Sequence, residues 1–460
     1  MKKRTAIVLA AGKGTRMKSQ HPKVLHEIAG EPLIAHVVKT IGACGVKKPV
    51  VVIGHGGEEV QAYLGEKALY AWQKEQLGTG HAVMVAQSAL DSDEQTVMVI
   101  CGDTPLLTQE TLEALFLAHE KKNALATVLT ARVANPKGYG RILRDDSGAV
   151  QAIVEEKDAT EEERVIKEIN AGTYCFDKEA LEKALEQIKP NNAQGEYYLT
   201  DVLAILRQQG IVAAFEMEDA REVMGINNRQ QLAEAERLMQ ERLRAKWMDA
   251  GVTMVDPNSV WLHGSVSIEE DTIIYPQTLL EGSVTIGRGS VIGPGTRIKD
   301  SHIGAEVIIQ NSIVLESHIS DGCTVGPFAY LRPGTRLEEE VKVGDFVEIK
   351  KSHIGKGSKI PHLSYVGDAL IGTDVNIGAG TITCNYDGEN KHLSVVEDGA
   401  FIGSNTNLVA PVRIGEGSVI GAGSTITKDV PAGALAVERN RQIIKDGYCK
   451  IRQKDCHTKK

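Results

Sequence analysis

The 460-residue sequence has few aromatic residues, with six Phe, three Trp and eleven Tyr. It also lacks an excess of positive charge, because 61 Asp and Glu outnumber 52 Lys and Arg. A nucleic-acid-binding protein carries a basic face, so this balance argues against that class. No stretch approaches the ~18 consecutive apolar residues of a membrane-spanning helix. These absences predict a protein that acts on small molecules, with no nucleic-acid partner and no membrane insertion.

Patterns of disulfides and zinc sites are missing as well. The seven cysteines are an odd number, are scattered along the chain and include no Cys-x-x-Cys pair. This distribution is typical of reduced thiols. The first four residues are basic, but the short apolar run 5–11 continues into Gly-rich sequence without a cleavage-type end, unlike a signal peptide. We therefore expect a cytoplasmic protein.

What the sequence does contain is a change of rhythm along its length. Up to about residue 229, β-type apolar runs such as 6–9 and 96–100 alternate with helical spacing such as 108–119. This alternation predicts an α/β domain over residues 1–229 with a largely parallel sheet. Residues 230–250 predict an amphipathic connector helix, although they also suit the last helix of the first domain.

From about residue 260, aliphatic residues recur every six positions, as in Ile268, Ile274, Leu280, Ile286 and Ile292. A period of six is neither helical nor a simple alternating strand, and fixed self-similarity marks a solenoid. We interpret residues 251–460 as a β-helix with aliphatic side chains in the interior and small residues in the turns. Of the 46 glycines, 27 lie in this part. Large aromatic side chains would not fit so narrow an interior.

The six-residue rhythm is interrupted between Ile377 and Ile402 by a polar segment, residues 381–392. Inserted loops on solenoids often lie on a binding face. A surface loop without function explains the segment equally well, so both interpretations stay open at this point.

In the first domain, the Gly-rich segment 9–17 follows the first predicted strand and precedes Lys23. It is neither a P-loop nor a dinucleotide fingerprint, because it lacks the residues that those motifs require. Gly12 and Gly14 would still let backbone N–H groups approach an oxyanion, and the neighbouring cations would add positive charge. The segment favours phosphate binding modestly over an ordinary strand-to-helix turn.

Two single residues also carry possible chemistry. Asp103 closes an apolar strand, a position where it could ligate Mg²⁺ or simply cap a helix. His362 lies two positions after the aliphatic Ile360 and is therefore expected outside the interior, about one coil before the polar insertion. A histidine can accept a proton near neutral pH, as a general base must.

Eight short motifs occur in a fixed order along the first domain. They are residues 9–17 with Pro22-Lys23, 73–80, Gly102-Asp103, 138–142, 154–158, 168–172, 195–198 and 225–229. Together they resemble the sugar-1-phosphate nucleotidyltransferases, and in particular the bacterial bifunctional N-acetylglucosamine-1-phosphate uridyltransferase/glucosamine-1-phosphate acetyltransferases. The resemblance runs essentially end to end. It implies a Rossmann-like nucleotidyltransferase domain followed by a left-handed parallel β-helix of hexapeptide repeats.

The same resemblance implies the reactions and the N-terminal site. Glucosamine-1-phosphate would be acetylated by acetyl-CoA, and N-acetylglucosamine-1-phosphate would then react with UTP, giving UDP-N-acetylglucosamine for peptidoglycan and lipopolysaccharide synthesis. Nucleotide and sugar would be bound by Leu9, Ala10, Ala11, Gly12, Gly14, Arg16, Lys23, Gln73, Gln76, Gly78, Thr79, Gly138, Glu155, Asn170 and Asn227. Asp103 and Asn227 would ligate Mg²⁺. Among these, Gln73, Gln76, Gly78 and Thr79 would read the uracil.

In the β-helix the resemblance implies that His362 is the general base and that Glu348 orients its imidazole. Substrate and acetyl-CoA would be bound by Arg332, Lys350, Tyr365, Asn376, Ala379, Asn385, Tyr386, Ser404, Ala422 and Arg439. Family members are homotrimers with the acetyl-transfer site between subunits. The tail from Arg439 onward, with eight Lys and Arg against two Asp, suits contact with the phosphates of CoA, although a solvated tail is the simpler interpretation.

Two other functions are compatible with parts of the pattern. A single-activity sugar-nucleotide pyrophosphorylase would use the β-helix only for regulation or oligomerisation, and the His362 set argues against it. A non-enzymatic scaffold would have no need of Asp103, Asn227 or the turn at Gly12 and Gly14.

Overall fold

A computed structural model describes residues 3–448 of the chain. The chain divides into two compact units, with the division between Glu241 and Arg242. This point lies inside the long helix α8 (Arg229–Asp249), which corresponds to the expected connector. The first part of α8 buries Ala235 and Leu238 against the N-terminal unit, whereas Leu243 and Trp247 pack against the core of the C-terminal unit.

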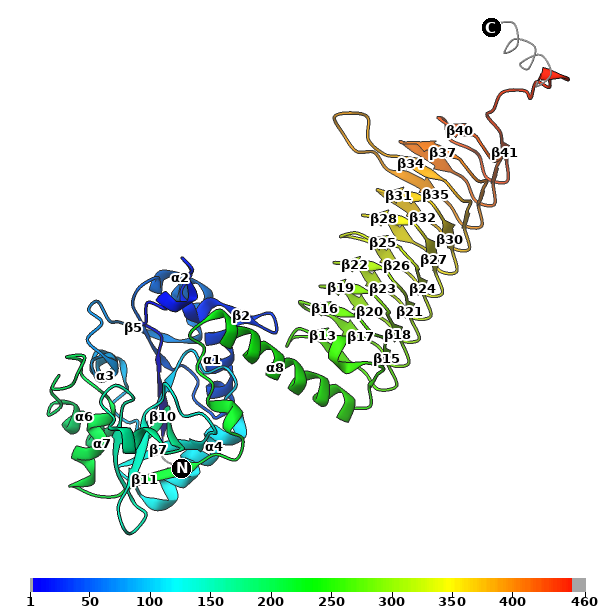
Figure 1. Cartoon of the computed structure of the whole chain (residues 1–460). Helices are drawn as coiled ribbons and strands as arrows, with labels where there is room; N and C mark the ends of the chain where they lie inside the picture. The colour runs from blue at the N-terminus through cyan, green and yellow to red at the C-terminus, as the bar shows by residue number, and fades with distance from the viewer. Residues whose placement is uncertain (1–2, 449–460) are drawn as a thin grey trace, which may run out of the picture. The chain divides into compact units, whose positions relative to one another are not determined.

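The N-terminal unit is built on a sheet with the strand order β11-β7-β10-β6-β1-β4-β5 (Figure 1). Its strands are β1 (Arg4–Leu9), β4 (Val50–Ile53), β5 (Leu69–Trp72), β6 (Thr96–Cys101), β7 (Ala126–Arg132), β10 (Glu168–Asp177) and β11 (Val212–Glu216). Most neighbours are parallel, as predicted, but β10 is antiparallel to both β6 and β7. Strands β8 (Arg141–Arg144) and β9 (Val150–Val154) pair with each other, and β8 also pairs with β10.

Helices cover both faces of this sheet, which explains why the central strands are apolar along their whole length. One core contains side chains of α1 (Leu33–Ala43), α2 (Gly57–Leu64) and α4 (Gln109–Lys122). The other contains side chains of α3 (Thr79–Ala86), α6 (Lys178–Leu185) and α7 (Thr200–Arg207). A short helix, α5 (Glu161–Arg164), follows β9. The predicted α/β class is confirmed.

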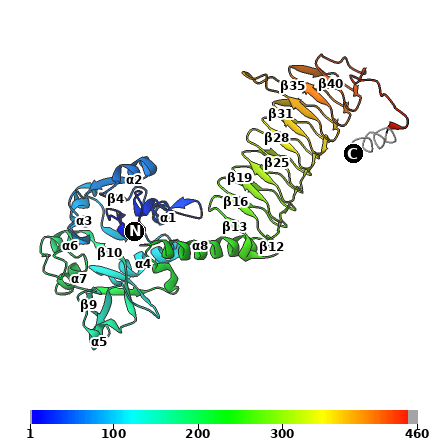
Figure 2. The ribbon, with the colours of Figure 1, turned by 45° about the horizontal axis from the view of Figure 1, so that its top comes forward.

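The C-terminal unit is a stack of short parallel strands that runs from β12 (Thr253–Met254) to β41 (Leu435–Ala436) and forms three long sheets (Figure 2). Each interior residue pairs with its counterpart one coil on, as Ile274 does with Ile292 and Ile292 with Ile309. One coil therefore holds 18 or 17 residues, which explains the slips in the six-residue rhythm. The described buried core of this unit contains only aliphatic side chains, Met and Cys, and the predicted β-helix is confirmed.

The polar insertion leaves the stack at one place. Ile377 pairs with Ile402, 25 residues further on, so this coil is longer than the others. The extra residues follow β34 (Ile382–Cys384) and form a loop closed by a bridge between Tyr386 and Lys391. In the described part of the chain, residues 3–448, we find no helix long and apolar enough to cross a membrane.

A paired substitution on β21 (Ile308–Ile309) tests the packing of the β-helix. Ile309 is fully buried, whereas Ile308, its neighbour on the same strand, is 38% exposed. We expect Ile309→Ala to lower the free energy of unfolding by about 2–5 kcal/mol, because it leaves a cavity in a narrow core. Ile308→Ala should change it by less than about 0.5 kcal/mol. Equal losses in urea unfolding would contradict the assigned faces.

Candidate functional site

The N-terminal unit has a cavity of about 290 Å³ where β1, β5 and β6 end. Ligands bind in open α/β sheets at this edge, beyond the carboxyl ends of parallel strands. Ten of the sequence-predicted residues line the cavity, namely Leu9, Ala10, Ala11, Gly12, Lys23, Gln73, Gln76, Gly78, Thr79 and Asp103. They come from three separate loops, and the strand order brings these loops together.

Opposite charges meet at one end of this cavity. Lys23 Nζ donates a short hydrogen bond to the Asp103 carboxylate and contacts Asn227 Oδ1 at 3.1 Å. Arg16 donates to the same oxygen at 2.8 Å. The side chains of Lys23 and Asp103 are each only 15% exposed, so the pair is largely shielded from water. The backbone of Asp103 also accepts a hydrogen bond from the N–H of Ile226, which holds the segment carrying Asn227 beside it.

The loop between β5 and α3 is fixed by its own side chains. Gln73 is 4% exposed and donates to the Gly78 carbonyl at 3.1 Å, whereas Gln76 donates to the Ala11 carbonyl at 2.6 Å. Gly78 has a φ of 108°, and a Cβ there would come within 2.6 Å of the Tyr197 carbonyl oxygen. Only glycine fits this position, which keeps the loop close to the backbone at residue 197.

Residues predicted to hold the sugar lie together on β9, β10 and the loop before β8. Asn170 is 8% exposed, and its side chain donates to the Tyr174 hydroxyl at 2.6 Å. Burial, with a contribution from Asp158, raises the pKa of the Glu155 carboxyl. A Cβ on Gly140 would lie 3.5 Å from both Glu155 and Asn170, whereas one on Gly138 would meet nothing within 4 Å. Gly140 is thus the glycine enclosed by this group, and sequence reasoning had singled out only Gly138.

The oxygen atoms of Asp103 and Asn227 suit the predicted Mg²⁺. Both contact Lys23 Nζ, so they already converge on one cationic centre. Among residues 3–448, no three His, Cys, Asp or Glu side chains gather into a metal-binding group. One carboxylate and one amide oxygen fit an ion that takes its other ligands from substrate phosphates and water, as Mg²⁺ does.

In the C-terminal unit, a column of predicted residues runs along one corner of the β-helix. Each stands two positions after an interior residue of the same sheet, because Ile360, Ile377, Ile402 and Ile420 occupy equivalent positions on successive coils. The column consists of His362, Ala379, Ser404 and Ala422. At its end, Arg439 donates to the Ala422 carbonyl at 2.8 Å. The column therefore begins at the predicted base and continues through small side chains.

The structure corrects the residue predicted to orient His362. Asp345, on β27 (Lys342–Asp345), pairs in register with His362 on β30 (Lys359–His362) and makes a short hydrogen bond to Nδ1 of the imidazole. Glu348 instead pairs in register with Tyr365 and accepts a 2.7 Å hydrogen bond from Arg332. Strand register places Glu348 in the wrong column. Asp345 could have been found from the sequence, because it precedes His362 by 17 positions, which is one coil.

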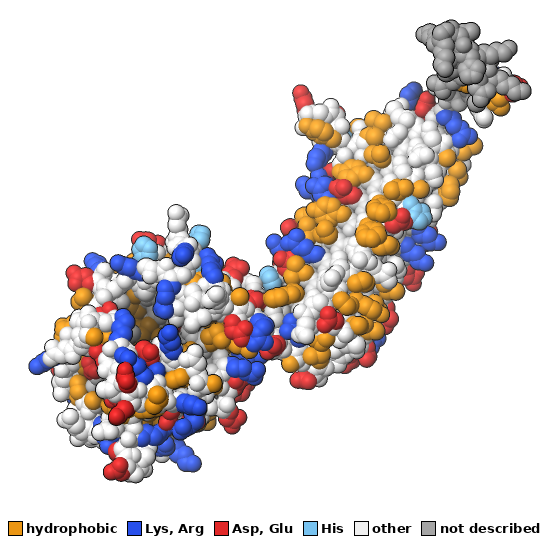
Figure 3. Space-filling view, viewed as in Figure 1, with side chains coloured by type: hydrophobic (Ala, Val, Ile, Leu, Met, Phe, Trp, Pro, Cys, Tyr) orange, Lys and Arg blue, Asp and Glu red, His pale blue; other side chains and the backbone are white. Residues whose placement is uncertain are grey.

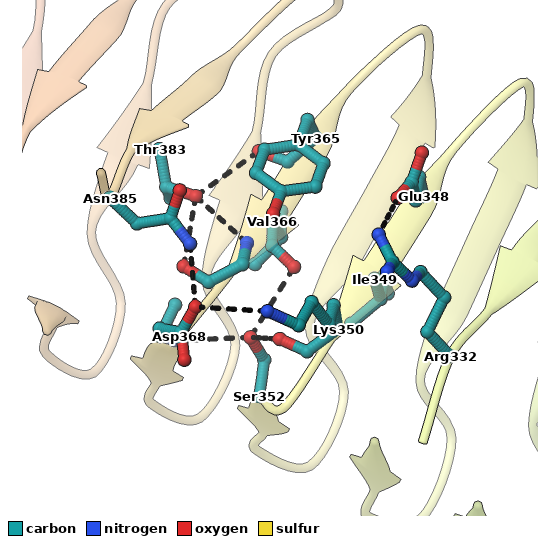
Figure 4. Close-up of polar contacts among 12 residues, drawn as sticks. Arg332, Glu348, Ile349, Lys350, Ser352, Tyr365, Val366, Asp368, Thr383 and Asn385 are labelled. Carbon is teal, nitrogen blue, oxygen red and sulfur yellow. Dashed lines mark hydrogen bonds and ion pairs between the residues drawn. The ribbon is translucent and has the colours of Figure 1, made fainter. Parts of the chain in front are cut away.

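A second group of polar residues lies on the adjacent sheet (Figure 4). The Asp368 carboxylate contacts Lys350 Nζ at 3.8 Å and accepts a 2.6 Å hydrogen bond from Asn385. Lys391, from the inserted loop, lies against Lys350, and the proximity of this second ammonium group lowers the pKa of Lys391. Two closely spaced cations favour a multiply charged anion between them. Sequence reasoning missed Asp368 and Lys391, whose positions depend on the path of the loop.

The remaining predicted residues are spread around these two groups. Tyr365 lies on β31 (Tyr365–Gly367) beside the Lys350 group, and Asn376 lies on β33 (Asn376–Ile377), one coil after Lys359. Tyr386 is 59% exposed on the inserted loop. Of the basic tail, residues 449–460 lie outside the described part of the chain.

Comparison with known families agrees with this division. Residues 5–255 match the nucleotidyl transferase family, residues 260–345 match the GMPPB C-terminal domain, and residues 394–428 match the bacterial transferase hexapeptide family. The first match covers more than half of the chain.

Curated relatives match over nearly the whole length. The bifunctional protein GlmU of Heliobacterium modesticaldum is 68% identical over 449 residues, which are 97% of this chain and 98% of that protein. The proteins of the same name from Geobacillus sp. and Syntrophomonas wolfei are 52% and 54% identical, over 97% and 96% of this chain and 98% of each relative. The chain therefore belongs to the family of the bifunctional protein GlmU and is a bifunctional transferase, with a nucleotidyltransferase unit followed by a hexapeptide-repeat acetyltransferase unit.

Proposed function

We propose that the chain makes UDP-N-acetylglucosamine in two steps. The C-terminal unit transfers an acetyl group from acetyl-CoA to the amine of glucosamine-1-phosphate. The N-terminal unit then joins N-acetylglucosamine-1-phosphate to UTP and releases pyrophosphate. One observation carries this proposal: each unit has its own constellation, a nucleotide-sized cavity at the strand ends and a His–Asp pair at the head of a column of small residues.

In the N-terminal unit, the reaction is an attack by a phosphate oxygen of the sugar on the α-phosphorus of UTP. No protein nucleophile is needed, since positioning and charge neutralisation are enough for transfers of this kind. The Gly-rich turn at Gly12 and Lys23 hold the nucleotide phosphates, and Gln73 and Gln76 face the uracil. Asp103 and Asn227 would hold Mg²⁺, which neutralises phosphate charge when bound.

The sugar is held by Glu155, Asn170 and the backbone at Gly140. A buried carboxylate and a buried amide offer directional hydrogen bonds to hydroxyl and acetamido groups. Because its pKa is raised, Glu155 takes up a proton at a higher pH than an ordinary glutamate does. Sugar binding that relies on the ionised form therefore weakens earlier as the pH falls.

In the C-terminal unit, His362 is the general base. Its Nδ1 faces Asp345, which leaves Nε2 to accept the proton from the attacking amine. The hydrogen bond from His362 lowers the pKa of Asp345, so this carboxylate stays ionised and can stabilise the imidazolium. Arg332, Lys350 and Lys391 supply positive charge for the sugar phosphate.

The other predicted residues complete the acetyl-transfer site. Tyr365, Asn376 and Asn385 surround the sugar, and Tyr386 stands on the loop beside it. The small side chains of Ala379, Ser404 and Ala422 leave room for acetyl-CoA along the column, and Arg439 lies at its far end.

We also propose that the chain works as a homotrimer. Exposed hydrophobic side chains occur along the C-terminal unit (Figure 3). Phe328, Phe346 and Leu363 follow one another at a corner of the β-helix, are 58–61% exposed and have φ values between 48° and 61°. The rings of Phe328 and Phe346 stack with centroids 5.4 Å apart. Large residues with positive φ are strained, and burial against a second copy would offset that cost.

Leu363 follows the proposed base His362 directly, so a subunit packed on this corner would lie beside the acetyl-transfer site. For localisation we propose the cytoplasm. The five described cysteines are all free, and burial raises the pKa of Cys44 and Cys323 to about 11. Neutral buried thiols of this kind are typical of a reducing compartment.

The two-site proposal predicts a reciprocal loss of activities. His362→Ala should lower acetyl transfer at least about 100-fold and leave pyrophosphate release within about twofold, because the base belongs only to the C-terminal unit. Asp103→Ala should do the reverse. Both half-reactions are measured on each variant, with circular dichroism as the control for folding. The loss of both activities in both folded variants would contradict two independent sites.

A second prediction separates the roles of Asp345 and Glu348. Asp345→Asn should lower kcat of acetyl transfer by about tenfold or more, since an amide cannot stabilise the imidazolium. Glu348→Gln should act mainly on KM for glucosamine-1-phosphate, through Arg332. The pKa of Asp345 lies below the ordinary ~3.9, so the carboxylate stays ionised at every assay pH above 5, and the pair is lost only in stronger acid. The opposite kcat pattern would restore Glu348 as the orienting residue.

A third prediction concerns the trimer. Phe346→Glu should lower the mass in light scattering from about three times 49.7 kDa to that of one chain, because it places charge in an apolar contact. Acetyl transfer should fall about tenfold or more, with uridylyl transfer within about twofold. Phe346→Leu is the matched control and should stay trimeric. An unchanged mass for Phe346→Glu would remove this corner from the interface.

A further inference from the structure

The N-terminal unit contains a buried arginine that no predicted role explains. Arg141 begins strand β8, and its side chain is only 1% exposed. A buried guanidinium is costly unless its donors find acceptors. All three of its nitrogen atoms do so: Nε and Nη2 donate to the Arg164 carbonyl at 3.3 and 3.2 Å, Nη1 donates to the Tyr139 carbonyl, and Nη2 also donates to Glu156 at 2.6 Å.

These contacts surround the proposed sugar site without entering it. The Tyr139 carbonyl belongs to residues 138–140, which we call the sugar loop, and the next carbonyl, that of Gly140, accepts the N–H of Asn170 at 2.9 Å. Glu156 follows Glu155 on the turn after β9. In the sheet, Arg141 pairs with Val154 and with Ile169, the residues just before Glu155 and Asn170. One guanidinium thus connects all three segments that carry the sugar-binding groups.

Glu156 holds the other end of the sugar loop. Desolvation raises the pKa of its carboxyl, but hydrogen bonding from Arg141 and from the backbone amide of Gly138 outweighs this, and the pKa is lowered. The ionised carboxylate therefore faces both the guanidinium and the start of the loop. Tyr139, between these anchors, is partly buried, and its ring lies close enough to Asp103 for that charge, after burial, to raise its pKa.

We propose that Arg141 and Glu156 form a positioning pair that holds the sugar loop in its binding geometry and thereby sets the affinity for the sugar 1-phosphate. Neither residue lines the nucleotide cavity. The pair acts through the Tyr139 carbonyl and the Gly138 amide, which fix the height of Gly140 against Glu155 and Asn170. The inference rests on the proposed uridylyl transfer and assigns the recognition of its acceptor.

The same strand offers a matched control. Arg144, three residues along β8, is 33% exposed and pairs with Glu168, with Nε donating to Oε2 at 2.8 Å. It is also an arginine–glutamate pair on β8, but it contacts the Gly148 carbonyl instead of the sugar loop. A purely structural contribution of such a pair to the sheet should be seen equally at both positions.

The test measures KM for N-acetylglucosamine-1-phosphate and for UTP in Arg141→Met, Arg141→Lys, Glu156→Gln and Arg144→Met, all in the full-length chain. Arg141→Met should raise KM for the sugar phosphate about tenfold or more and change KM for UTP less than about twofold. Arg141→Lys should recover part of the loss, because one ammonium can replace some of the hydrogen bonds. Glu156→Gln should raise the same KM by about threefold, and Arg144→Met should change neither KM.

Equal changes in both KM values, or the same effect from Arg144→Met, would overturn the positioning role. If Arg141→Met does not fold, Glu156→Gln decides, since its amide keeps the shape of the carboxylate, and an unchanged sugar KM in that variant would also overturn the proposal. Absence of UDP-N-acetylglucosamine synthesis in the wild-type chain would instead contradict the proposed function itself, so the two failures are distinguishable.

Discussion

Parallel strand pairing in register is the constraint on which both sites depend. In the N-terminal unit it aligns the carboxyl ends of β1, β5 and β6 at one edge, where three loops far apart in the sequence line one cavity. In the C-terminal unit it repeats every 17 or 18 residues and turns sequence spacing into columns of side chains. A side chain's neighbours are then decided by its position in the repeat, because backbone hydrogen bonds leave no freedom to slide.

This dependence explains what the sequence could and could not predict. The six-residue period predicted the β-helix, and its interruption predicted the loop, because interior positions of a solenoid must be aliphatic and evenly spaced. The Gly-rich turn and Asp103 were found because residues at strand ends have recognisable flanking runs. Glu348 was assigned to His362 by resemblance, and counting one coil back from His362 leads to Asp345 instead. Register was thus available in the sequence but needed a coil length of 17 at that point.

Other contacts could not have been predicted from spacing. Lys391 reaches Lys350 only through the path of the inserted loop, which leaves the repeat. The choice of Gly140 over Gly138 depends on a backbone hydrogen bond to Asn170 across the sheet. Buried Arg141 has no sequence signal, because an arginine at the start of a strand is usually exposed. Long-range polar contacts of this kind follow from the fold and are not encoded by local periodicity.

The two sites share an electrostatic arrangement although their folds differ. Each cation assigned to a phosphate is paired with a carboxylate: Lys23 with Asp103, Arg332 with Glu348 and Lys350 with Asp368. An incoming phosphate offers the same charge and more acceptor oxygens, so it can replace the carboxylate without leaving a shielded cation unpaired. For Lys23 the exchange has a further consequence. Its partner oxygens on Asp103 and Asn227 are those that suit Mg²⁺, so metal and phosphate binding favour each other by removing Lys23 from between them.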